Sequence, residues 1–250
     1  MPDSRVTFVG DAMAAVVQGI IEVRNTIGQP PVIVGGLAVL SRLSQPYRAT
    51  IDLDIVDRMR GDTPQLEVLR AVDTNQPIEP AAVMIDTAHG KVKVDVLEVR
   101  QVELDMPSDD PGDRLHASAH AWAHDSATNM TIEVVGASGG PIMVTTPIAE
   151  PGPLVAMKLQ AVMNRSTGKQ GTDLLDIVRL SLDHATRKSC QTQIGAVDSA
   201  VAEDMERHVD LWFVQRRSQT LQRIRAAGGS DVLADDVALV SELLLAATKR

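Results

Sequence analysis

The chain has few aromatic residues and almost no cysteine. Only 2% of its 250 residues are Phe, Trp or Tyr, so we expect an aliphatic core and no base-stacking platform for single-stranded nucleic acid. The sequence contains a single cysteine, Cys190. This excludes an internal disulfide and any CxxC or Cys/His zinc pattern, and no disulfide-linked partner is expected.

Long apolar runs are also missing. No stretch approaches the ~20 residues that a membrane-spanning helix needs, and the opening residues MPDSRVTFVGD lack the basic-then-apolar pattern of a signal segment. We therefore expect a cytoplasmic protein with no membrane partner. With 44% hydrophobic and 23% charged residues, the chain suits a globular protein with a sizeable core.

An excess of positive charge is absent. The net charge is -9, with 11 Lys and Arg against 21 Asp and Glu in residues 1–150, and 13 against 12 in residues 151–250. An acidic chain does not attract nucleic acid through its overall field. Any such contact must come from a local patch, for which the C-terminal part is the better place.

The hydrophobic periodicity changes along the chain and predicts an α+β protein. The first part alternates helical spacing with β-rich runs and includes two hairpins, around His89-Gly90 and around Gly136 to Gly140. The expected helices there cover 12–28, 37–43 and 63–72, and the expected strands lie within 31–36, 50–57, 81–99 and 130–146. The remainder shows helical spacing over 152–165, 172–184, 194–225 and 231–249.

The segment TPIAEPGP, residues 146–153, is the natural joint between these parts. We therefore predict two domains. Residues 1–146 form a mixed sheet with flanking helices, and residues 147–250 form a helical bundle.

Two aspartates stand in a run that otherwise resembles a buried strand, YRATIDLDIVD (residues 47–57). Asp52 and Asp54 are two residues apart, so on a strand they share one face. Two carboxylates on one face repel each other unless a cation lies near them. This cost suggests that the pair has a use.

The residues before this run suggest phosphate binding. Gly35 and Gly36 follow a short strand and precede a helix, and they let the backbone approach a ligand closely. The helix N-terminus offers free N–H groups and a positive dipole end. Asp95, placed mid-strand among valines in VKVDVLEV, is a third candidate ligand. Three carboxylates beside a phosphate cradle suit two Mg²⁺ ions.

The stretch GGLAVLSRLSQPYRATIDLDI resembles the signature of the polymerase-β-like nucleotidyltransferases, which is Gly-Gly, a helix, and then D-x-D. More narrowly, RATIDLD is similar to the AbiEii/MenT-like toxins of type IV toxin–antitoxin systems. That branch also has a later lysine and a D-x-x-D motif, which here match Lys158, Asp173 and Asp176.

The resemblance implies a role for each matched residue. Asp52 and Asp54 would hold the metal ions and, with Lys158 and Asp176, form the catalytic set. Lys158 would neutralise the triphosphate, and Asp173 and Asp176, which share a helix face, would orient it or an acceptor hydroxyl. The nucleotide-binding residues would be Gly35, Gly36, Arg48, Thr50, Lys158 and Asp173.

The implied activity is Mg²⁺-dependent transfer of a nucleoside monophosphate from an NTP to RNA, at the 3′ end of tRNA, by a toxin with a cognate antitoxin. The D-x-D site handles the NTP and does not identify the acceptor. A small hydroxylated acceptor, as in antibiotic nucleotidyltransferases, therefore stays open. A catalytically silent nucleotide- or partner-binding module is the third hypothesis.

Simpler interpretations stay open for several of these residues. Asp52, Asp54 and Asp95 can be solvated strand residues, and Lys158 can extend along a helix into solvent. Asp173 and Asp176 can be acids near a helix N-terminus that the dipole favours.

Two further segments are of interest. On a helix, His116, His120 and His124 recur every fourth residue, which is too spread for one metal, and a solvated helix face is the better interpretation. The segment RRSQTLQRIR contains a short basic cluster that is either solvated or contacts RNA phosphates. Its arginines are Arg216, Arg217, Arg223 and Arg225.

Overall fold

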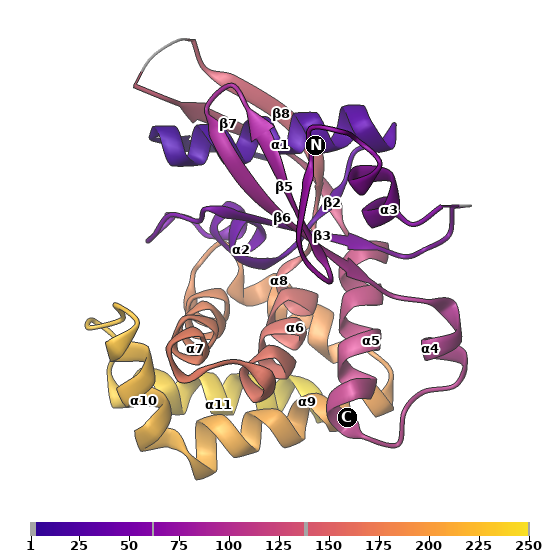
Figure 1. Ribbon diagram of the computed structural model, residues 1–250. Helices are drawn as coiled ribbons and strands as arrows, with labels where there is room; N and C mark the ends of the chain where they lie inside the picture. The colour runs from indigo at the N-terminus through magenta and orange to yellow at the C-terminus, as the bar shows by residue number, and fades with distance from the viewer. Residues whose placement is uncertain (1–3, 62, 138–139, 250) are drawn as a thin grey trace. The chain divides into compact units, whose positions relative to one another are not determined.

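The computed structural model describes residues 4–61, 63–137 and 140–249 (Figure 1). The chain forms two compact units. The first comprises Met1–Ser41, Gln45–Gln101 and Ala123–Glu150, and the second comprises Arg42–Ser44, Val102–Trp122 and Pro151–Arg250. Residues 102–122 thus belong to the helical unit although they precede residue 146. The predicted division into two domains, 1–146 and 147–250, stays a prediction.

The first unit is built on a mixed eight-stranded sheet with the order β1-β7-β8-β2-β3-β6-β5-β4. Pairing is parallel for β1 with β7, β2 with β8, and β3 with β6, and antiparallel elsewhere. The strands are β1 (Ser4–Val9), β2 (Val32–Ile33), β3 (Asp52–Asp57), β4 (Gln76–Glu79), β5 (Ala82–Thr87), β6 (Gly90–Glu98), β7 (Thr128–Val135) and β8 (Ile142–Ile148). The predicted α+β class is confirmed.

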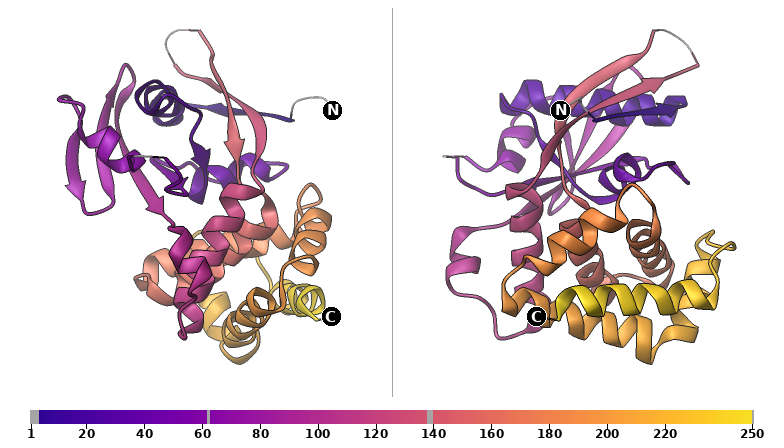
Figure 2. Two further views of the ribbon diagram at one scale, coloured as in Figure 1. Left: turned by 90° about the vertical axis from the view of Figure 1, so that its right-hand side faces the viewer. Right: turned by 180° about the vertical axis from the view of Figure 1, so that it is seen from behind.

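Helix α1 (Asp11–Ile27) covers one face of this sheet and is seen nearly end-on in the left view of Figure 2. A methyl group on Gly19 would lie 3.4 Å from Val92 Cγ1, which shows how closely α1 packs on β6. The helix ends as predicted, because Gly28 adopts a left-handed conformation with φ of 76°. The unit also contains α2 (Gly35–Arg42) and α3 (Gln65–Arg70).

Both predicted hairpins are confirmed as antiparallel pairs, β5 with β6 and β7 with β8. The tip of the second, at residues 138–139, lies outside the described residues. Two strands, β1 and β4, were not expected. Both lie at the edges of the sheet. Strand β4 is exposed along its whole length and contains Pro77, so it lacks the alternation that burial imposes. In β1 only Phe8 is buried.

The second unit contains eight helices from α4 onward in its described part. They are α4 (Gln101–Asp105), α5 (Pro111–Asp125), α6 (Pro151–Asn164), α7 (Thr167–Leu182), α8 (Arg187–Gly195), α9 (Ser199–Val209), α10 (Arg217–Ala226) and α11 (Ala234–Thr248). A π-helical turn, η1 (Asp210–Gln215), connects α9 to α10. No described helix combines the length and apolar character that a bilayer crossing requires.

Candidate functional site

Strands β3 and β6 run parallel, and their register brings the charged residues onto one face. Asp52 lies beside Lys93, and Asp54 lies beside Asp95. Since aligned residues of paired strands point the same way, all four side chains share a face. The alternate residues, Leu53 and Val94 among them, are fully buried on the other face. The alternation in the sequence therefore predicted the shared face of the aspartates correctly.

Lys93 is the cation of this face, and the sequence analysis missed it. Its Nζ lies 3.1 Å from Asp95 Oδ1 and 2.9 Å from Glu79 Oε2. Burial lowers the pKa of Lys93, but hydrogen bonds and attraction to Glu79 and Asp95 outweigh burial and raise it. Asp95 is thus ion-paired rather than simply solvated. The alternation in VKVDV placed Lys93 and Asp95 on one face and was the available signal.

The two glycines lie where β3 meets the first turn of α2. Gly35 has φ of +62°, and a methyl group built on it would lie 1.9 Å from Asp54 Oδ2. The backbone N–H of Val34 donates to the Asp54 carbonyl at 3.0 Å. Only glycine fits here, for both its conformation and its space. The Asp54 carboxylate therefore packs directly against the N-terminal turn of α2.

Arg48 and Thr50 reach the same turn from the loop before β3. A methyl group on Gly36 would lie 3.2 Å from Arg48 Nη2 and 3.2 Å from Thr50 Oγ1. The Thr50 hydroxyl donates to the Asp52 carbonyl at 3.3 Å, and Arg48 Nε donates to the Tyr47 hydroxyl at 3.2 Å. A guanidinium and a hydroxyl thus border a helix N-terminus, an arrangement suited to a phosphate.

The donor set of this face fits a hard cation. Asp52, Asp54 and Asp95 are all half-buried, and carboxylate oxygens are ligands that Mg²⁺ prefers. Within residues 4–61, 63–137 and 140–249, no group of three or more His, Cys, Asp or Glu side chains is arranged to hold a metal ion. Since Mg²⁺ is commonly bound through one or two carboxylates plus substrate phosphates, two aspartates suffice. The predicted three-carboxylate site stays a prediction.

The other predicted residues lie in the helical unit, where Lys158 of α6 meets two aspartates of α7. Its Nζ lies 2.6 Å from Asp173 Oδ1 and 2.8 Å from Asp176 Oδ2. Asp173 is 2% exposed, Asp176 0% and Lys158 7%. Burial lowers the pKa of Lys158, but attraction to Asp176 and Asp173 outweighs burial and raises it.

Two of the simpler interpretations are therefore wrong. Lys158 does not extend into solvent, because its ammonium is held in a buried ion triad. Asp173 and Asp176 do not lie in the first turn of a helix, because α7 begins at Thr167. Arg165, which the sequence analysis missed, lies with Nε 3.2 Å from Asp173 Oδ2. It is close enough for an ion pair but not aligned for a hydrogen bond.

The four arginines of the basic segment differ in their surroundings. Arg217 Nη2 donates to the Ala234 carbonyl at 2.8 Å. Arg223 bonds the Gln170 side chain, and its guanidinium lies 5.0 Å from the Trp212 ring centroid. Arg216 stacks on the same ring at 5.1 Å, but Arg216 and Arg225 are exposed. Only these two are thus placed to meet a partner without losing a hydrogen bond within the unit.

The interpretation of the three histidines as a solvated face of α5 is wrong for His120. This residue is 4% exposed, and its ring centroid lies 4.2 Å from that of His116. Burial, together with the proximity of His116, lowers the pKa of His120 to about 3. Its Nδ1 lies 2.6 Å from the His116 carbonyl, so a neutral ring with Nδ1 protonated satisfies the contact.

Comparisons with known proteins give little. No family model matches the chain, and no curated protein matches it. Among solved structures, the chain is similar to an antigenic nucleotidyltransferase-like protein from Paracoccidioides brasiliensis, with a TM-score of 0.43 and 16% identity over 88% of this chain and 94% of that chain. A likeness this low assigns neither a family nor an activity to the chain.

Proposed function

We propose that the chain is a magnesium-dependent nucleotidyltransferase that moves a nucleoside monophosphate from an NTP to RNA. The observation that carries the proposal is the packing of the Asp54 carboxylate against Gly35. A methyl group at this position would lie 1.9 Å from Asp54 Oδ2, so only glycine fits. It joins a pair of carboxylates on one strand face to the N-terminus of α2. Metal ligands and a phosphate cradle therefore adjoin each other, as phosphoryl chemistry needs.

In the reaction, an acceptor hydroxyl oxygen bonds to the α-phosphorus of the NTP. The bond from that phosphorus to the bridging oxygen of the β-phosphate breaks, pyrophosphate leaves, and the hydroxyl proton passes to a carboxylate of the β3 face. Bound Mg²⁺ would activate the attacking oxygen and stabilise the leaving pyrophosphate. Asp52 and Asp54 would hold it, and Asp95, which is ion-paired with Lys93 on the same face, is the predicted third ligand.

The remaining residues bind and orient the nucleotide. Gly35 and Gly36 open the first turn of α2 to the phosphates, and Arg48 and Thr50 contact them from the loop. We propose that Lys158 contacts the triphosphate, as the resemblance implies, while it shares its charge with Asp173 and Asp176. Asp173 and Asp176 hold its ammonium in place, which supports an orienting role for both.

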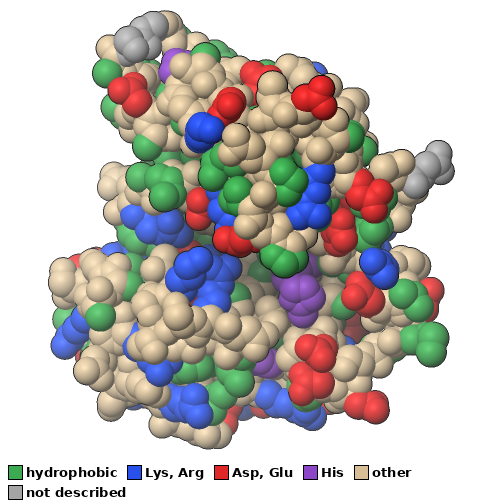
Figure 3. Space-filling view, in the orientation of Figure 1, with side chains coloured by type: hydrophobic (Ala, Val, Ile, Leu, Met, Phe, Trp, Pro, Cys, Tyr) green, Lys and Arg blue, Asp and Glu red, His purple; other side chains and the backbone are tan. Residues whose placement is uncertain are grey.

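The acceptor proposed is RNA, at the 3′ end of tRNA, in a toxin whose action a cognate antitoxin counters. Support comes from the exposed Arg216 and Arg225. In the view of Figure 3, Lys and Arg side chains also predominate on the side of the helical unit that carries α7 and α10. Such a surface supplies sequence-independent phosphate contacts.

The test is incubation of the purified protein with each labelled NTP, Mg²⁺ and total RNA, followed by a gel. Label should enter RNA for the wild type, and Asp52→Asn or Asp54→Asn should abolish incorporation while the thermal unfolding midpoint changes little. Asp86→Asn, which removes an exposed strand carboxylate of β5, is the matched control and should retain activity.

Three results would contradict the proposal in different ways. Near wild-type incorporation by Asp52→Asn would show that Asp52 and Asp54 of β3 do not bind the metal ion needed for transfer. Incorporation into a small hydroxylated molecule but never into RNA would favour the small-acceptor enzyme. No transfer from any NTP, with nucleotide binding intact, would favour the silent binding module.

A further inference from the structure

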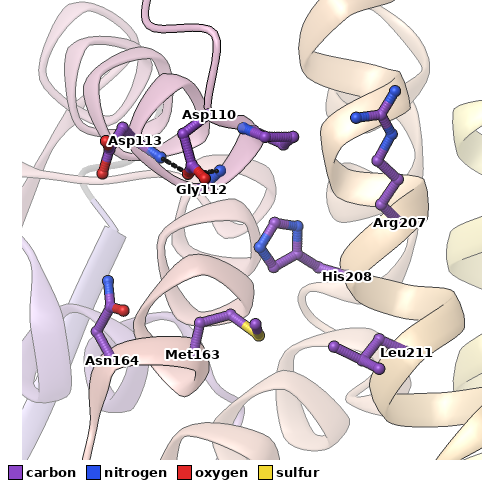
Figure 4. Close-up of a pocket in the computed structure, with 9 residues that line it drawn as sticks. Asp110, Gly112, Asp113, Met163, Asn164, Arg207, His208 and Leu211 are labelled. Atoms are coloured by element: carbon purple, nitrogen blue, oxygen red, sulfur yellow. Dashed lines mark hydrogen bonds between the residues drawn. The ribbon is translucent and has the colours of Figure 1, made fainter.

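A separate pocket lies wholly within the helical unit. It encloses about 370 Å³ and is lined by three segments (Figure 4). The turn before α5 and the start of α5 contribute Asp110 to Asp113, the end of α6 contributes Met163 and Asn164, and α9 with η1 contributes Arg207, His208 and Leu211. None of these residues belongs to the site proposed for transfer.

His208 is the buried polar group of this pocket. It is 6% exposed, and its ring projects from α9 into the space between the three segments (Figure 4). Nδ1 lies 2.7 Å from the Asp204 carbonyl, and because a carbonyl only accepts, Nδ1 carries the proton. In the neutral ring Nε2 is then an acceptor, and it has no hydrogen-bond partner among the described residues.

An ion pair fixes the walls of the pocket. Arg114 of α5 donates from Nε and Nη2 to the two carboxylate oxygens of Asp204, at 2.7 and 2.6 Å. Its Nη1 donates to the Ser108 carbonyl at 2.9 Å, which holds the turn that leads to Asp110. Asp110 Oδ1 in turn accepts from the backbone N–H of Gly112 at 2.8 Å. The pocket is therefore preorganised, and it ends at a π-helical turn, a feature frequent at functional sites.

The lining selects a ligand by its chemistry. Met163 and Leu211 point toward one another and form an apolar floor (Figure 4), which suits a planar ring. His208 Nε2 faces the space above this floor (Figure 4). Asp113 lines the opposite wall, but its carboxylate points away from His208. Arg207, exposed on α9 beside His208, adds a cation. A ring with amino donors at its edge and an anionic group on its tail complements this set.

We propose that this pocket binds a nucleoside monophosphate unit whose base carries an amino group. The base lies over Met163 and Leu211, its amino group donates to His208 Nε2, and its phosphate meets Arg207. The unit can be free or can end an RNA strand. The inference uses the helical unit alone and does not depend on the transfer activity.

The experiment measures binding calorimetrically without Mg²⁺ in the Asp52→Asn/Asp54→Asn background, which disables the proposed transfer site. AMP and CMP should bind at least 10-fold more tightly than UMP. Uracil presents a carbonyl oxygen where adenine and cytosine carry the amino group, and this leaves the buried His208 Nε2 unpaired. Adenosine should bind more weakly than AMP, and Arg207→Gln should remove that difference. A trinucleotide ending in A that binds more tightly than AMP identifies an RNA end as the ligand, and equal affinity identifies the free nucleotide.

His208→Phe keeps a ring of similar size and should weaken AMP at least 10-fold. Because His208 is buried, Arg207→Gln at an exposed position of α9 provides a second variant that leaves the core intact. It should weaken the binding of AMP but not that of adenosine. Asp235→Asn, in the exposed first turn of α11, is the surface control and should bind normally.

The proposal is overturned if no nucleotide binds, if UMP binds as tightly as AMP, or if inorganic phosphate competes as well as AMP. Unchanged AMP affinity in both His208→Phe and Arg207→Gln overturns it as well. These outcomes are separate from those of the transfer assay. If the chain binds AMP in this pocket but transfers no nucleotide, the pocket proposal is supported and the proposed transfer activity is not. If the chain transfers nucleotide but does not bind AMP here, only the pocket proposal is contradicted.

Discussion

Asp54 lies directly against Gly35, so that a methyl group on the glycine would meet the carboxylate oxygen at 1.9 Å. This relationship joins β3 to the first turn of α2. It explains why a left-handed backbone, a carboxylate and a helix N-terminus occur within one small region. It also makes the glycine more sensitive to substitution than backbone conformation alone requires.

Gly35→Ala should therefore lower the free energy of unfolding and abolish transfer. Gly28→Ala is the matched control, because Gly28 also has a positive φ, of +76°, but a methyl group there meets nothing within 4 Å. The conformational strain of each is about 1 kcal/mol, and Gly35→Ala adds the collision with Asp54. Chemical denaturation measures both. Equal destabilisation with retained transfer in Gly35→Ala would show that Asp54 moves freely.

Lys158→Met should destabilise the chain by about 3–5 kcal/mol, because it leaves Asp173 and Asp176 buried without their cation. The triple variant with Asp173→Asn and Asp176→Asn should recover part of this loss, since the uncompensated charges are gone. Urea denaturation gives the comparison. Lys188→Met, on the exposed surface of α8, is the control and should change little.

The same lysine separates a structural role from a nucleotide-binding one. If Lys158 acts on the triphosphate, the triple variant should fold and yet need much more NTP for half-maximal transfer. Wild-type NTP dependence in a folded triple variant would make the buried triad structural only.

The part of this site that lies on one strand could be predicted, because the alternation of side chains along a strand can be recognised in a short stretch of sequence. The alternation in TIDLDIVD placed Asp52 and Asp54 on one face, and the structure has them there. The pairing of Lys93 with Asp95 and Glu79 could be only partly predicted. The sequence places Lys93 and Asp95 two apart, but Glu79 comes close only through the order β6-β5-β4.

Burial of polar residues on helices could not be predicted in the same way. His120 and Asp176 each follow another polar residue by one helical turn, His116 and Asp173, and yet both are buried. A neutral histidine and an ion triad satisfy this burial, and neither leaves a local sequence pattern. The same holds for His208, whose Nε2 has no hydrogen-bond partner among the described residues and faces the pocket lined by α5, α6 and α9.

The pH dependence of stability should carry the signature of His120. Folded His120 stays neutral until its pKa of about 3, whereas in the unfolded chain it takes a proton near pH 6.5. Between these values the unfolded chain binds more protons, so the free energy of unfolding falls as the pH is lowered from about 6.5 toward 3. The full effect is on the order of 5 kcal/mol.

Urea denaturation at a series of pH values tests this. His120→Gln should be less stable at pH 7 and should show a shallower fall toward pH 4. His184→Gln, at a side chain that is 82% exposed, should leave the slope unchanged. An identical slope in His120→Gln and the wild type would mean that His120 titrates normally in the folded chain.

The surroundings of the four arginines divide the basic segment into two pairs with different expected effects. The double variant Arg216→Gln/Arg225→Gln removes two exposed charges and should weaken RNA binding with little change in stability. It should also make RNA binding less sensitive to salt, because the slope of log affinity against log salt concentration falls by roughly 1 for each lost phosphate contact. Arg217→Gln/Arg223→Gln breaks contacts with Ala234 and Gln170 and should lower the unfolding midpoint. Binding of NTP with Mg²⁺ should be the same in the first double variant and the wild type.

RNA binding by filter retention at two salt concentrations gives the comparison. Equal affinity and equal slope in Arg216→Gln/Arg225→Gln would remove these arginines from RNA recognition and favour a small-molecule acceptor.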